Sequence, residues 1–92
     1  MAANRVVVLE SVEEKLHEGW ALCFEWCRYE YTDGTSHRGY RFIWKRPNGH
    51  YQPARGQARL PSVAIAVKLI GKAEAAGWGK HVGEMDAYGV VE

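Results

Sequence analysis

Residues 40–46, with the sequence Tyr-Arg-Phe-Ile-Trp-Lys-Arg, constrain the fold more than any other segment of the chain. Their large aromatic side chains occupy every second position, which is the period of a β-strand. A Pro-Asn-Gly sequence follows at residues 47–49, and an Asn-Gly pair favours the positive φ values of a tight hairpin turn. The segment therefore predicts a strand followed by a hairpin, with a further strand at about residues 50–59.

Residues 20–31 form a second aromatic segment, which fits either a helix or a strand. A helical stripe would contain Trp20, Cys23, Cys27 and Tyr31, whereas one strand face would contain Trp20, Leu22, Phe24 and Trp26. Aromatic enrichment and weak helix formers favour the strand. The Thr-Asp-Gly-Thr sequence at residues 32–35 is a strong turn signal that would lead from this strand into the next.

The N-terminal residues predict a short strand and then a short helix. Residues 5–9 are rich in β-branched side chains, which favour a strand. Ser11 followed by Glu14 matches the capping box that opens many helices. We therefore expect a helix at about residues 12–18, with Gly19 at its end.

The clearest helix pattern covers about residues 62–76. Ser62 can cap its start, and Pro61 is tolerated there. Lys68 and Lys72 lie four residues apart and are expected on the outer side. The predicted buried stripe, which Ile65 and Leu69 widen, consists of Val63, Ala66, Val67, Ile70 and Ala73.

These elements predict an α+β fold in a single domain of residues 1–92, with a loosely ordered tail at residues 79–92. The expected architecture is a three-stranded antiparallel sheet, to which a short N-terminal strand can add. One main C-terminal helix and a short N-terminal helix pack against it. A chain of this size can bury one small core without a metal or disulfides.

Charge is distributed very unevenly along the chain. Residues 34–73 contain no carboxylate, and eight cations fall within them, whereas the segments on both sides are acidic. Charge asymmetry of this kind bears on partners rather than on fold. It favours either a nucleic acid or an acidic protein as the partner.

A basic sheet face is the main candidate site. If the two aromatic strands pair, the face opposite their aromatic core carries Arg41 and Lys45. Cations would meet phosphates there, and tyrosine rings would stack on bases. The alternative is that this face is only solvated and binds no partner. The acidic residues Glu25 and Glu30 on the neighbouring strand would reduce the positive charge of the face. The predicted nucleic-acid-binding residues are Arg41, Lys45, Arg55, Arg59, Tyr29 and Tyr31.

The chain shows no pattern typical of a metal site, a cofactor or a catalytic centre. Cys23, Cys27, His37 and His50 lack the close pairs that structural zinc requires. Ser36 and His37 are adjacent, so on a strand they point to opposite faces. We therefore expect neither catalytic nor metal-binding residues, and no cofactor.

The sequence thus predicts a small non-enzymatic binding module of bacterial or phage type that acts on nucleic acid. The alternative is a protein–protein interaction module or inhibitor with an acidic partner, or a homodimer of unknown function. Two cysteines that an extended segment would keep apart are expected to be reduced thiols, as in the cytoplasm. Because no long apolar run follows the first residues, we expect neither a signal peptide nor a membrane span.

Overall fold

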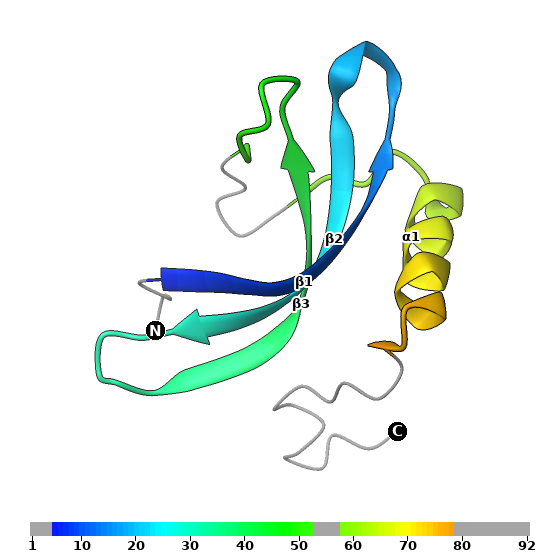
Figure 1. Ribbon diagram of the computed structural model, residues 1–92. Coiled ribbons are helices and arrows are strands. Elements are labelled where there is room, and N and C mark those ends of the chain that lie inside the picture. Colours follow the sequence, from blue (N-terminus) through cyan, green and yellow to red (C-terminus); the bar gives the residue numbers. More distant parts are fainter. Residues whose placement is uncertain (1–4, 53–57, 79–92) are drawn as a thin grey trace.

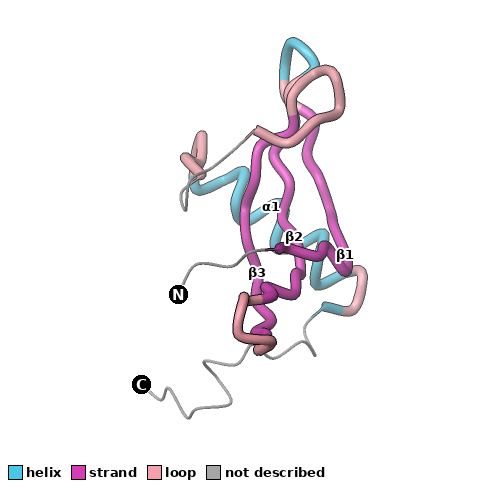
Figure 2. Tube along the Cα trace, turned by 90° about the vertical axis from the view of Figure 1, so that its left-hand side faces the viewer, coloured by secondary structure: helices cyan, strands magenta, loops and turns pink. Residues whose placement is uncertain are grey.

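The computed structural model describes residues 5–52 and 58–78, which form a three-stranded antiparallel sheet and one α-helix (Figure 1). The strands are β1 (Arg5–Lys15), β2 (Ala21–Glu30) and β3 (Ser36–Lys45), and the helix is α1 (Val63–Ala75). They lie side by side in chain order, with β2 in the centre (Figure 2). The predicted α+β class is confirmed.

The predicted N-terminal helix at residues 12–18 is wrong. β1 continues through residue 15, and only a 3-10 turn, His17–Gly19, separates it from β2. Residues 11–15 pair in register with residues 21–25, so β2 satisfies their backbone groups. A seven-residue helix is too short to be stable alone, and the sheet pairing therefore outweighs the local capping pattern.

Residues 20–31 resolve in favour of the strand, since residues 21–30 form β2. The predicted turn before β3 is stabilised by Asp33, whose Oδ1 accepts hydrogen bonds from the Thr35 amide at 2.9 Å and hydroxyl at 2.6 Å. Of the strand expected at residues 50–59, the described residues form no named strand and make one isolated bridge, between Lys45 and Tyr51. Residues 53–57, and the tail expected at residues 79–92, lie outside the described residues.

The aromatic core lies between α1 and one face of the sheet. Trp26, Ala73 and Trp78 are buried together, and Phe24 packs against them with its ring centroid 5.8 Å from that of Trp78. The Tyr40 hydroxyl donates a hydrogen bond to the backbone oxygen of Trp78 at 3.1 Å. We call this side the helix face. The other side, the opposite face, carries Cys23, Glu25, Cys27, Arg41 and Ile43.

The rotation of α1 differs from the prediction. The helix buries Leu69 and Ala73, and it leaves three predicted core residues exposed: Val63, Val67 and Ile70. Two lysines contact the sheet in this rotation, since their Nζ atoms lie 2.9 Å (Lys68) and 2.7 Å (Lys72) from carboxylate oxygens of Glu14 on β1. Lys68 and Lys72 therefore lie beside the contact between helix and sheet, and not on the outer side of α1 as predicted.

Candidate functional site

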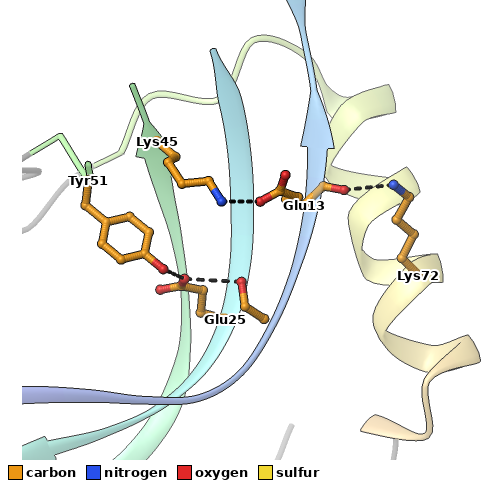
Figure 3. Close-up of polar contacts among 6 residues, drawn as sticks. Glu13, Glu25, Lys45, Tyr51 and Lys72 are labelled. Carbon is orange, nitrogen blue, oxygen red and sulfur yellow. Dashed lines mark hydrogen bonds and ion pairs between the residues drawn. The ribbon is translucent and has the colours of Figure 1, made fainter. Parts of the chain in front are cut away.

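Glu25 is a fully buried carboxylate in the middle of the opposite face. Its exposure is 0%, and Arg41, directly across on β3, donates from Nε to Oε1 at 2.9 Å. Its other oxygen, Oε2, accepts hydrogen bonds from the hydroxyls of Tyr51 at 2.5 Å and Ser11 at 3.2 Å (Figure 3). Three segments of the chain thus converge on one carboxylate, which is how a buried charge is normally tolerated.

Tyr51 closes part of the opposite face. Its ring lies 5.6 Å from the Arg41 guanidinium carbon, a cation–π distance. Burial, together with the hydrogen bond to Glu25, raises the pKa of the Tyr51 phenol. The residue reaches this position because the turn at Asn48 and Gly49 brings the chain back along β3, where Gly49 has a φ of 89°.

Lys45, the second cation predicted on this face, is also paired with a carboxylate. Its Nζ contacts Glu13 on β1 across β2, and this hydrogen bond raises the pKa of Lys45 (Figure 3). The structure therefore brings Arg41 and Lys45 to one face, but it pairs both with acidic residues from the N-terminal half.

The other predicted site residues are distributed more widely, and among those described only Tyr29 is a strand residue on the same face as Arg41 and Lys45. Tyr29 is half-buried on the opposite face, and burial raises the pKa of its phenol. Tyr31 follows β2 and packs edge-on against His37, with ring centroids 5.3 Å apart. The backbone oxygen of Arg59 accepts a hydrogen bond from Trp44, which points to the helix face. Arg55 lies outside the described residues.

The two cysteines are buried free thiols on the opposite face. Burial, the largest cause for each, raises the pKa of both Cys23 and Cys27 to about 11, so both are protonated near neutral pH. A protonated thiol is a poor nucleophile and a poor metal ligand. Within residues 5–52 and 58–78 there is also no group of three or more potential ligands that could hold a metal ion.

An open apolar groove of about 280 Å³ lies at the end of the sheet where β2 begins and β3 ends. Its walls include Trp20 and Trp44, whose rings meet edge to face with centroids 6.2 Å apart. We call this site the Trp groove. The full lining consists of Leu16, His17, Trp20, Trp44, Gln52 and Pro61.

Two turns build this end of the molecule. Gly19 has a φ of 83°, and a Cβ atom there would lie 3.0 Å from Cβ of Pro47, so the turn before β2 packs closely on the turn after β3. Arg46 and Arg59 are exposed and lie close to the groove along the chain, since each is two residues from a lining residue and the Arg59 backbone oxygen accepts a hydrogen bond from Trp44 at 2.8 Å. Alternation alone assigned both tryptophans to the core, which is why the sequence did not reveal the groove.

Comparison of the chain with protein-family models, with curated proteins and with solved structures finds no match. Among the helices of the described residues, none has the length and apolar character needed to cross a bilayer.

Proposed function

We propose that this protein is a small non-enzymatic module that binds single-stranded nucleic acid at the Trp groove. The observation that carries the proposal is the combination of an open groove walled by Trp20 and Trp44 with two exposed cations, Arg46 and Arg59, that lie close to it along the chain. Base–aromatic stacking contributes about 1–3 kcal/mol per base, and cations along the strand contact its phosphates.

The charge around the groove supports an anionic ligand. Three exposed cations, Lys15, Arg46 and Arg59, lie within two residues of a lining residue in the sequence, compared with one exposed carboxylate, Glu18. The carboxylate-free segment, residues 34–73, would therefore contribute to ligand binding mainly through the cations that do not pair with carboxylates inside the fold. In this proposal Arg41 and Lys45 chiefly stabilise the fold, because they form ion pairs with Glu25 and Glu13.

Single-stranded nucleic acid fits the groove better than duplex does. Bases that are already unstacked can enter an aromatic groove, whereas duplex bases would first have to separate. A non-enzymatic, cytoplasmic role is supported by the two buried thiols, which are protonated near neutral pH and unbridged.

Titration of labelled single-stranded DNA, single-stranded RNA and duplex DNA at about 50 and 200 mM salt tests the proposal. Binding of single strands should weaken steeply with salt. The Arg46→Glu/Arg59→Glu variant should bind at least about tenfold more weakly, and its salt slope should fall by about two. Trp20→Ala should lose about 1–3 kcal/mol of binding free energy while the circular dichroism spectrum stays unchanged.

Arg38→Glu is the matched control, because Arg38 is an exposed arginine near the far end of β3. It should leave the affinity within about twofold once the general charge effect is allowed for. The proposal fails if single strands do not bind even at low salt, or if Arg38→Glu weakens binding as much as the double variant. Salt-independent binding of a proline-rich peptide in the groove would instead indicate a protein partner.

A further inference from the structure

The outer side of α1 exposes an unusual row of apolar side chains. Val63, Val67 and Ile70, spaced by four and three residues, are 79%, 61% and 42% exposed. The sheet covers α1 on one side only, and the helix lies at the margin of the described structure (Figure 1). A surface helix normally presents polar residues to water, so this row is typical of a surface that another molecule covers.

Gly71 would allow a second helix to approach α1 closely. It lies in the interior of α1, where glycine costs about 1 kcal/mol relative to alanine. A Cβ atom at this position would meet no other part of the described chain within 4 Å. Packing among the described residues therefore does not require glycine here, whereas the close approach of a second helix would.

The charges at the two ends of α1 indicate what kind of molecule covers the row. The first turn of α1 contains no acidic residue, although the helix dipole favours a carboxylate there. Glu74 lies near the opposite end of the helix, eleven residues after Val63 and therefore on the same row. A carboxylate is unfavourable at that end of its own helix and favourable beside the start of another.

We propose that two copies of this chain form a dimer through antiparallel α1 helices. In the antiparallel register centred on the middle of α1, at the level of positions 68 and 69, Val67 faces the partner's Ile70. In the same register, Val63 faces the partner's Glu74. One register thus buries the apolar row and also brings each Glu74 to the start of the other helix. Lys68 and Lys72 are held by Glu14, which keeps their charges away from the contact. The self-complementary pattern fits the isologous contact that two-fold symmetry demands.

Sedimentation equilibrium of the full chain, from low micromolar to several hundred micromolar, tests this dimer. The wild-type chain should be a dimer at the upper end of this range, and Val67→Lys should raise the dissociation constant at least about a hundredfold, because the contact would bury two unpaired ammonium groups. Ala75→Lys is the matched control, since it adds the same charge to the exposed surface of α1 away from the row. It should leave the dissociation constant within about threefold.

Glu74→Lys tests the antiparallel register. It should weaken the dimer by about fivefold to tenfold while leaving the monomer as stable as before or more so, because a cation suits the end of its own helix. A chain that stays monomeric at every concentration overturns the proposal. If Val67→Lys also destabilises that monomer, the apolar row is covered by another part of the same chain and not by a second copy. Equal effects of Val67→Lys and Ala75→Lys also overturn it. The sedimentation experiments contain no nucleic acid, so their outcome does not depend on whether the Trp groove binds it.

Discussion

Replacing Glu25 with glutamine tests whether the buried carboxylate holds the opposite face together. Glutamine keeps nearly the same volume, but it removes the counter-charge of Arg41 and replaces one acceptor oxygen with a donor group. Arg41, Tyr51 and Ser11 all donate to this side chain, so at least one of them would lose its acceptor. The variant therefore removes the charge and leaves the shape.

The expected loss of stability is about 3 kcal/mol, at the low end of the range for breaking a buried ion pair. A hydrogen bond to a charged group contributes about 1.5–3 kcal/mol, but the three bonds are not additive. Water can also replace part of the loss, because the side chain of Arg41 is 23% exposed and Tyr51 is 42% exposed. For a domain of this size, 3 kcal/mol corresponds to a fall in Tm of about 12–24 °C.

Thermal and urea unfolding, followed by circular dichroism and tryptophan fluorescence, measure this change. Glu30→Gln is the control, because Glu30 lies on the same strand but is 32% exposed in its ion pairs with Arg28 and Arg5. Such surface pairs contribute about 0–1 kcal/mol, so the control should lose no more than that. Equal losses in the two variants would refute the reasoning, since they would mean that burial adds nothing to the role of Glu25.

Two further predictions follow from the pKa shifts. Hydrogen bonds from Lys72 and then Lys68 lower the pKa of Glu14 below 4.5, so its ionised form stabilises the fold above that pH, and this contribution disappears as the pH falls through the lower folded value. Glu14→Gln should therefore be less stable than wild type near neutral pH, and urea unfolding should show the two converging in acid; a constant gap would contradict this. Because burial raises the pKa of Cys23 and Cys27 to about 11, a thiol reagent should label the native chain only as fast as it unfolds, and rapid labelling of either cysteine would contradict this assignment.

The elements that the sequence predicted correctly are those with a strong local signal. The strands predicted at residues 20–31 and 40–46 combine aromatic alternation with turn residues, and they correspond to β2 and β3. The helix predicted at about residues 62–76 has a capping serine and a helical period, and it corresponds to α1. The segment at residues 11–15 failed because its local pattern favours a helix, whereas its pairing with β2 extends the sheet. Local rules cannot weigh a non-local pairing of this kind.

The apolar pattern of the sequence also could not predict which side of α1 is buried. Apolar residues surround most of the helix, so the period allowed several rotations. The observed rotation buries Leu69 and Ala73. It also brings Lys68 and Lys72 to Glu14, and both of these contacts join segments more than fifty residues apart. The opposite face posed the same difficulty: alternation placed Arg41 and Glu25 on one side, but their burial depends on Tyr51 folding over them.

The distribution of charge along the sequence has an explanation inside the fold. Four of the eight cations in residues 34–73 pair with carboxylates that precede this segment: Arg41 with Glu25, Lys45 with Glu13, and both helix lysines with Glu14. A basic segment and an acidic segment that pair within one domain produce a block pattern even when no partner is bound. Charge counts alone therefore overstate the surface offered to a polyanion. Within the proposal, nucleic acid would be bound by the exposed residues Arg46 and Arg59, each two residues along the chain from a residue that lines the Trp groove.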